Sequence, residues 1–120
     1  MKKILIVEND LTDFAFLKVC LKMIPDIEFD RYDSPEVVFK IVKDFTKYSI
    51  IITDGNFGAS KIDGFEFCER LRNMGVKIPI IFSSAYATPE RIEKALEHAN
   101  EYILKPFASK DFSHVVLKYL

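Results

Sequence analysis

Short apolar runs alternate with helix-forming segments five times along this chain, and this alternation restricts the possible folds more than any other feature. Four of the runs, Ile4–Val7, Ile50–Ile52, Ile80–Phe82 and Tyr102–Leu104, are mostly β-branched or aromatic and contain no polar alternation. Such runs are typical of parallel strands that are covered on both faces. The fifth, Ile27–Tyr32, alternates between apolar and polar residues, which predicts a strand at the edge of the sheet.

The segments between and after these runs carry apolar residues at helical spacing. Ser34 and Thr88 each precede a proline and an acidic residue, which is a helix-start pattern, and Ser109 is expected to cap the last helix. The residues expected to line the five helices are Phe14, Leu17, Leu21 and Ile24; Val38, Ile41, Val42 and Phe45; Phe67, Cys68 and Leu71; Ile92, Ala95 and Leu96; and Phe112, Val115, Val116 and Tyr119.

Five strand-then-helix repeats within 120 residues predict an α/β fold. We expect one domain spanning residues 1–120, with a doubly wound, flavodoxin-like parallel sheet of five strands in the order 2-1-3-4-5. Five helices would cover the two faces of this sheet. In sheets of this order, ligands bind beyond the carboxyl ends of the strands, where strands one and three diverge.

Composition excludes several classes of function. The formal net charge is −1, which does not provide the basic surface expected of a nucleic-acid binder. No apolar run exceeds four residues, so we expect no transmembrane helix, no membrane partner and a cytoplasmic location. Cys20 and Cys68 lie in apolar helical stretches, which favours buried free thiols in a reducing compartment.

Polar side chains follow each of the central strands, and the fold would bring them to one edge of the sheet. Oxygen-rich pockets of this kind suit Mg²⁺, a nearby lysine can stabilise a transferring phosphoryl group, and an aspartate can be the nucleophile. The chemistry indicated is phosphoryl transfer to Asp54, assisted by Mg²⁺ and Lys105. The residues concerned are Glu8, Asn9 and Asp10; Thr53, Asp54 and Asn56; Ser83 and Ser84; and Lys105.

These residues give the chain a resemblance to the receiver domains of two-component response regulators, of the single-domain type. The resemblance covers essentially the whole chain. It consists of Glu8 at the first position of the family's acidic pair after the first strand, Asp54 after the third, Ser84-Ala85 after the fourth and Lys105-Pro106 after the fifth. Each feature alone is common, but the ordered set is specific.

The resemblance implies a role for each residue of the site. Asp54 would be the phosphoacceptor. Mg²⁺ would be held by Glu8 through water, by Asn9, by Asp54 and by the backbone carbonyl of Asn56. Ser84 and Lys105 would contact phosphoryl oxygens.

The resemblance implies two further features, whereas Asp10 has a simpler explanation that does not involve the metal. Tyr102 matches the aromatic side chain that changes rotamer together with Ser84, and the peptide bond before Pro106 is expected to be cis. Asp10 is better explained as a helix cap than as a metal ligand, although it would add negative charge beside the site.

The sequence departs from the family pattern at the metal site and in one loop. Asn9 stands where the family usually has the aspartate that binds the metal directly, so this position supplies an amide oxygen without a negative charge. The Asp54–Gly64 loop is two residues longer than the usual run, lacks the usual proline and has two extra glycines, which predicts a mobile loop over the site.

The expected function is that of a stand-alone signalling receiver. A sensor histidine kinase or a histidine phosphotransfer protein would donate a phosphoryl group to Asp54, and the resulting switch would alter contacts with a downstream protein. The only catalysis expected is Mg²⁺-dependent self-phosphorylation and dephosphorylation. The alternative is a degenerate receiver that acts as a phosphorylation-independent interaction module. A flavin binder or small hydrolase is disfavoured because no Gly-rich phosphate loop follows the first strand.

Overall fold

Five parallel strands form a single sheet in the order β2-β1-β3-β4-β5, as the sequence predicted. The computed structural model describes all residues from 1 to 120. β2 is an edge strand, in agreement with its apolar–polar alternation. The strands are β1 (Lys2–Val7), β2 (Ile27–Tyr32), β3 (Ile50–Asp54), β4 (Ile80–Ser84) and β5 (Glu101–Leu104).

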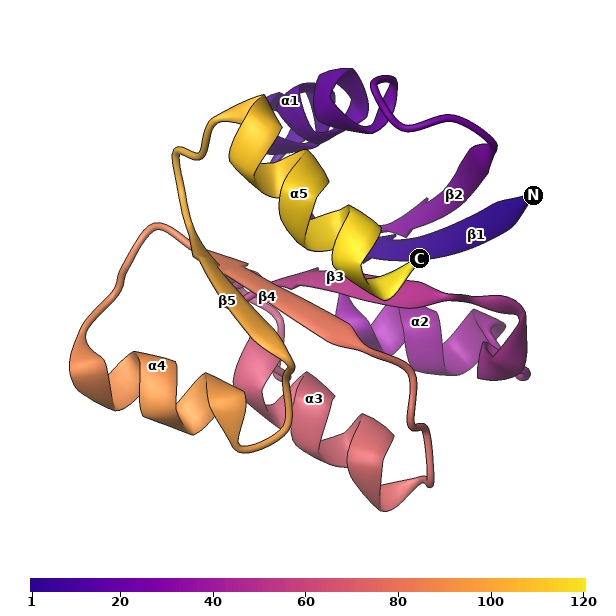
Figure 1. The fold of residues 1–120 in the computed structure, drawn as a ribbon. Coiled ribbons are helices and arrows are strands. Elements are labelled where there is room, and N and C mark those ends of the chain that lie inside the picture. The colour runs from indigo at the N-terminus through magenta and orange to yellow at the C-terminus, as the bar shows by residue number, and fades with distance from the viewer.

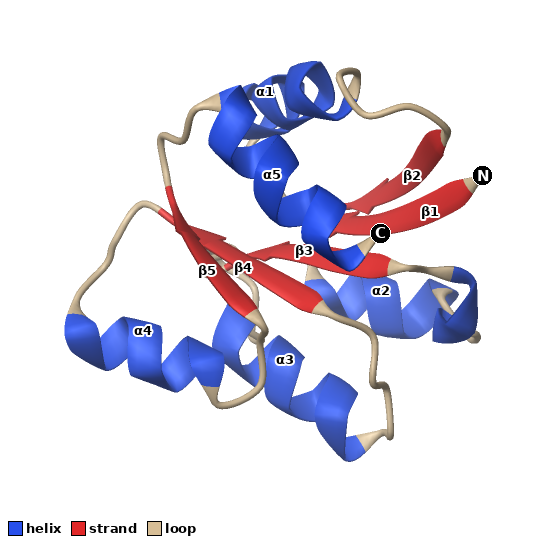
Figure 2. Ribbon diagram, viewed as in Figure 1, coloured by secondary structure: helices blue, strands red, loops and turns tan.

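Helices cover both faces of this sheet. Figure 1 shows α1 and α5 on one face and α2, α3 and α4 on the other, and Figure 2 shows the same layers by secondary structure. A single turn of 3₁₀-helix spans Phe45–Lys47. The α-helices are α1 (Leu11–Leu21), α2 (Pro35–Ile41), α3 (Gly64–Asn73), α4 (Pro89–Leu96) and α5 (Ser109–Tyr119).

The central strands are buried on both faces, and this divides the core into two layers. Alternate residues of β1 point to opposite sides of the sheet. Ile4 and Ile6 pack in the layer that contains residues of α1 and α5, whereas Leu5 and Val7 pack in the layer that contains residues of α2, α3 and α4. Burial on both faces therefore explains the continuous apolar runs of β1, β3 and β4. The prediction of a fully covered strand was wrong for Tyr102–Leu104, because β5 lies at the sheet edge, is only partly buried and exposes Leu104.

Side-chain capping fixes the starts of most helices. The Asp10 carboxylate accepts a hydrogen bond from the Asp13 N–H at 2.8 Å, so its expected role as a cap is confirmed. Ser34 and Thr88 cap α2 and α4 as predicted. The prediction for Ser109 was wrong, because Ala108 holds the cap position of α5 and no side chain caps this helix.

Two helices end earlier than the apolar spacing predicted. Ile24 lies beyond the end of α1, which ends at Leu21. Pro25 follows Ile24, and a proline disfavours helical geometry at the residue before it. Val42 adopts an extended conformation after α2, and Phe45 belongs to the 3₁₀ turn. All three side chains are nevertheless buried, so their apolar character reflects the core and not the helix.

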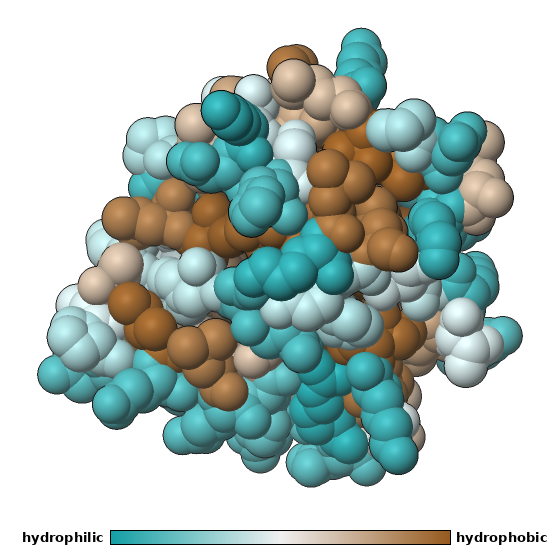
Figure 3. All heavy atoms as spheres, in the orientation of Figure 1, coloured by the Kyte–Doolittle hydropathy of each residue, from teal (hydrophilic) through white to brown (hydrophobic).

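Some residues expected to line helix faces are exposed. Ile41 and Leu96 are exposed large hydrophobic residues, as are Leu104 and Leu117. In Figure 3, apolar side chains are visible over α4, over β5 and over the C-terminal half of α5. Cys20 and Cys68 are buried and unpaired, as predicted. No helix combines the length and the apolar character that crossing a membrane requires.

Candidate functional site

Four strand ends bring polar side chains to one edge of the sheet. Glu8 directly follows β1, Asp54 and Ser84 are the last residues of β3 and β4, and Lys105 directly follows β5. Because all five strands are parallel, these ends lie at the same edge. The predicted convergence of Glu8, Asp54 and Lys105 is confirmed by direct side-chain contacts.

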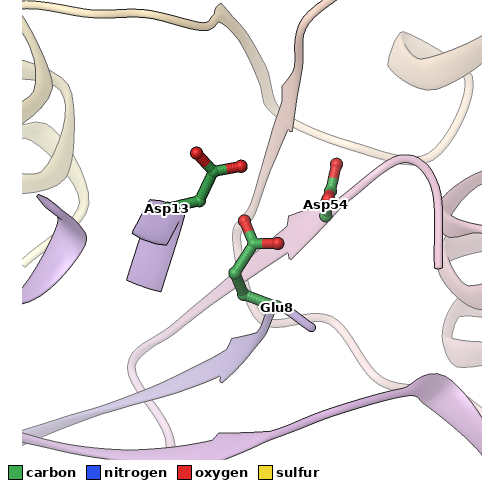
Figure 4. Close-up of side chains that lie close together, drawn as sticks. All are labelled: Glu8, Asp13 and Asp54. Carbon is green, nitrogen blue, oxygen red and sulfur yellow. The ribbon is translucent and has the colours of Figure 1, made fainter. Parts of the chain in front are cut away.

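Lys105 lies at the centre of these contacts. Its Nζ atom is 2.7 Å from Glu8 Oε1, 2.9 Å from Asp13 Oδ2 and 3.5 Å from Asp54 Oδ2. In Figure 4 the three carboxylates, from the end of β1, the first turn of α1 and the end of β3, point toward one another. One lysine thus bridges three acidic groups.

Burial makes the electrostatics of this cluster unusual. The Glu8 side chain is only 2% exposed, and this burial raises its pKa to about 7, although its hydrogen bond to Lys105 opposes the shift and Asp54 adds to it. Burial disfavours the charge on Lys105, but hydrogen bonds to Asp13 and Glu8 outweigh it and raise the lysine pKa. The lysine therefore stays charged, and the acids around it compete for its three N–H donors.

Asp13 belongs to this cluster, and the sequence reading missed it. Glu8, Asp13 and Asp54 each offer a carboxylate oxygen that lies within 4.8 Å of the others. Asp13 is the third residue after the cap of α1, and its side chain points back over the start of the helix. The spacing Asp10–Asp13 is the only local signal in the sequence, and by itself it indicates no more than an acidic residue in the first turn of a helix.

Backbone packing positions Asp54 and the loop that follows it. Asp54 Oδ1 accepts a 2.6 Å hydrogen bond from the Gly55 N–H. The Gly64 N–H donates to the Gly55 carbonyl at 3.1 Å, which closes the loop. A Cβ atom on Gly64 would lie 2.2 Å from the Asp54 carbonyl oxygen, so only glycine fits there.

The Asp54–Gly64 loop is anchored at several points and differs from the loose connection that its glycines suggested. Phe57 and Ile62 are buried in the core. The Ser60 hydroxyl is 2.6 Å from the Glu36 carboxylate of α2. The longer loop is therefore packed against the core and against α2 beside the site.

The two asparagines expected at the metal both have exposed side chains. Asn9 is exposed and lies beside Gly58 of the loop, in a depression that Ser60 and Glu36 also line. Asn56 is exposed, and its Oδ1 accepts a 2.9 Å hydrogen bond from the Gly58 N–H. The negative charge at the site thus comes from Glu8, Asp13 and Asp54.

Ser84 and Tyr102 are linked through Tyr86. The Ser84 Oγ accepts a hydrogen bond from the Tyr86 N–H at 3.2 Å, and the Tyr102 hydroxyl donates to the Tyr86 carbonyl. The Tyr102 ring stacks on Phe82 of β4, with ring centroids 5.3 Å apart. The Lys105–Pro106 peptide bond is cis, as the resemblance implied.

A second cation lies near Ser84, and the sequence reading did not single it out. Arg91 Nη2 is 3.3 Å from Ser84 Oγ. Arg91 belongs to the first turns of α4, and no local sequence pattern indicates that its side chain reaches back to the end of β4.

Comparison with known proteins agrees with this fold. The family model described as "Response regulator receiver domain" matches residues 4–117. The nisin biosynthesis regulatory protein NisR of Lactococcus lactis is 35% identical over 109 residues, which cover 90% of this chain and 45% of NisR. Response regulator RppA of Synechocystis is 33% identical over 64 residues, covering 52% of this chain and 26% of RppA. The chain thus spans less than half the length of these two relatives.

Solved structures show the same fold. A two-component response regulator from Clostridium difficile is 26% identical, with a TM-score of 0.84, and the match covers 99% of this chain and 95% of that one. The beryllofluoride-activated DrrB receiver domain is 18% identical, with a TM-score of 0.82 and coverage of 99% and 97%.

Proposed function

The chain belongs to the receiver-domain family of two-component response regulators, and on that premise we propose that it is a phosphorylation switch whose acceptor is Asp54. The observation that carries the proposal is the meeting of Asp54, Glu8 and Lys105 at one buried edge of the sheet. Receiver domains in general interact with histidine kinases and with downstream targets. The partners proposed here are a sensor kinase or a histidine phosphotransfer protein on one side and a protein target on the other.

In the proposed reaction, an Asp54 carboxylate oxygen attacks the phosphorus atom of a phosphohistidine. The new O–P bond forms as the P–N bond breaks, and the imidazole nitrogen retains the electron pair of that bond. Asp54 Oδ1 is held by the Gly55 N–H, and Oδ2 faces Lys105. The ammonium of Lys105 is placed to balance negative charge that develops on the transferred group.

Receiver domains bind Mg²⁺ at an acidic pocket, and the donor atoms of this site fit that ion. Three carboxylates with oxygens within 4.8 Å of one another provide the hard oxygen ligands that Mg²⁺ prefers. Glu8, Asp54 and Asp13 would hold the ion, with the Asn9 amide and the Asn56 carbonyl as the further ligands expected from the sequence. When bound, Mg²⁺ would neutralise charge on the phosphoryl oxygens.

Signal output in this proposal uses the link between Ser84, Tyr86 and Tyr102. A phosphoryl group that draws the Ser84 hydroxyl toward Asp54 changes the hydrogen bond from Tyr86, and Tyr102 is bonded to the same residue. The result is a shift between two populations of the β4–α4 region. We propose that residues 1–120 form one such switch domain and that it works in the cytoplasm.

Phosphorylation of Asp54 can be tested with acetyl phosphate and Mg²⁺, followed by phosphate-affinity electrophoresis and intact mass spectrometry. The wild-type chain is expected to gain one phosphoryl group, and Asp54→Asn is expected to gain none. Asp63→Asn is the matched control, because Asp63 caps α3 in the same loop and asparagine is an equally good cap. A wild-type chain that stays unmodified with acetyl phosphate and with a kinase donor contradicts the proposal.

A second function, an interaction module that works without phosphorylation, is favoured by one observation. Asn9 directly follows Glu8 and carries no charge, so metal binding is expected to be weaker than in a site with an aspartate there. Isothermal titration with Mg²⁺ separates the two functions. Binding within the millimolar range of cellular Mg²⁺ supports the switch, and a dissociation constant far above that range supports the module.

A further inference from the structure

Arg91 of α4 has no role in the phosphoryl transfer proposed above, although its side chain reaches Ser84. Its Nη2 donates to Ser84 Oγ at 3.3 Å. A Cβ atom on Gly55 would also lie 3.3 Å from this nitrogen, so the guanidinium packs against the backbone that directly follows Asp54. The arginine of α4 therefore lies beside Ser84 and beside Gly55, the residue that directly follows the expected phosphoacceptor.

No carboxylate neutralises this arginine. Seven ion pairs within 4.0 Å are formed in the molecule, and none of them involves Arg91. Its Nε atom is buried and has no hydrogen-bond partner. A guanidinium has five N–H donors in a fixed planar arrangement that matches phosphate oxygens, so unpaired donors next to Ser84 and Gly55 point to an anionic ligand.

The hydrogen bonds of Ser84 fit the same conclusion. Its Oγ accepts from Arg91 and from the Tyr86 N–H, which occupies both lone pairs. The hydroxyl proton remains available for donation. Donation by a cation to Oγ polarises the O–H bond and strengthens it as a donor toward a phosphoryl oxygen.

Aromatic rings hold the guanidinium in this position. The Arg91 Cζ atom lies 5.0 Å from the ring centroid of Phe65 and 5.6 Å from that of Tyr86. Packing between rings reduces the side-chain freedom that an exposed arginine would lose on binding a ligand. Lys94 lies over the same Phe65 ring at 4.7 Å, but it forms no hydrogen bond with Ser84.

We propose that Arg91 is a phosphoryl-binding residue: its guanidinium donates to the phosphoryl group on Asp54 and thereby ties the start of α4 to the phosphorylation state. This inference rests on the proposed function, because it requires a phosphoryl group on Asp54. It supplies a second cation, in addition to Lys105, from the opposite face of the sheet. It also gives α4 a direct contact with the modified site, independent of Tyr102.

The test uses beryllofluoride with saturating Mg²⁺ as the phosphoryl mimic, titrated into the full chain and followed by amide NMR. Arg91→Gln is expected to weaken the apparent affinity about tenfold or more, since hydrogen bonds to charged groups are strong. Lys94→Gln is the matched control, because it removes a cation from the same ring, and it is expected to stay within about twofold of wild type. Arg91→Lys is expected to recover only part of the affinity, because lysine lacks the planar set of donors.

A second measurement needs no variant and remains valid if Arg91→Gln fails to fold. The Arg91 Nε–H resonance of the wild-type chain is expected to shift when beryllofluoride binds. The inference is overturned if this resonance stays unchanged while Asp54 and its neighbours respond, or if Arg91→Gln binds as tightly as Lys94→Gln. If the wild-type chain does not bind beryllofluoride at all, the proposed function and this inference fail together.

Discussion

Asp13 and Lys105 form a 2.9 Å ion pair that joins the first turn of α1 to the residue after β5. The Asp13 side chain is 42% exposed, whereas that of Lys105 is 13% exposed. The pair therefore lies at the mouth of the site, outside the tighter contact between Lys105 and the buried Glu8. A carboxylate on α1 thus belongs to the acidic group that could hold a metal ion, and in the proposed site it adds negative charge that the neutral Asn9 does not supply.

Replacing Asp13 with asparagine is expected to weaken Mg²⁺ binding. The substitution removes one of three carboxylates from the cluster, and the attraction of a divalent cation falls with the negative charge around it. We expect a threefold to tenfold increase, roughly, in the dissociation constant measured by isothermal titration. Asp10→Asn is the control, because this exposed cap lies outside the cluster and asparagine preserves the cap. Equal affinities for the two variants would show that Asp13 has no part in metal binding.

Asn9→Asp is expected to have the opposite effect. It adds a carboxylate next to Glu8 without changing the size of the side chain. Mg²⁺ should bind about tenfold more tightly, and acetyl phosphate should modify Asp54 faster at limiting Mg²⁺. Without metal, the added charge should destabilise the fold slightly, because like charges repel. Thermal unfolding with and without Mg²⁺ measures both effects, and a variant with unchanged affinity would place residue 9 outside the metal site.

The residues of the site that follow strands could be predicted, because the carboxyl ends of parallel strands lie at the same edge of a sheet. Once Ile4–Val7, Ile50–Ile52 and Tyr102–Leu104 are recognised as strands, Glu8, Asp54 and Lys105 must share an edge. The meeting of these three side chains needed no knowledge of helix orientation.

The helix-borne part could not be predicted in the same way. Asp13 and Arg91 reach the site only because of the rotation and tilt of α1 and α4 against the sheet, which depend on packing between distant segments. The predicted ends of two helices were wrong for a related reason. Ile24 and Phe45 are apolar because the core requires them, so periodicity alone extended their helices too far.

Gly64→Ala is expected to destabilise the fold and disturb Asp54. The added methyl group would lie 2.2 Å from the Asp54 carbonyl oxygen and 2.7 Å from the Gly55 Cα, so the backbone must move. We expect a loss of about 2 kcal/mol or more in the free energy of unfolding, measured in urea. Gly58→Asn is the control, since Gly58 has a φ of 63° and open surroundings, and asparagine tolerates that conformation. Similar stabilities for the two variants would contradict the requirement for glycine at position 64.

Tyr48→Phe is expected to lower stability in a way that depends on pH. The buried Tyr48 donates a 2.6 Å hydrogen bond to Asp30 Oδ2, and Lys3 lies 3.2 Å from the same oxygen. Burial opposes the charge on Asp30, but these two contacts outweigh it and lower the Asp30 pKa below its ordinary value. The native state therefore favours the ionised form. This contribution is fully present above the unfolded pKa, at about pH 4, and is lost as the pH falls through the lower folded value.

At pH 7 the substitution should cost about 1 kcal/mol, because a hydrogen bond to a charged group is lost but Asp30 is partly exposed and screened. The difference between wild type and Tyr48→Phe, measured by urea unfolding, should be constant from about pH 7 to 5 and shrink toward pH 3. In an Asp30→Asn background the same substitution should have a pH-independent effect, since the titrating partner is gone. A difference that persists undiminished at pH 3 would mean that the Tyr48 hydroxyl contributes through packing and not through the ionised Asp30.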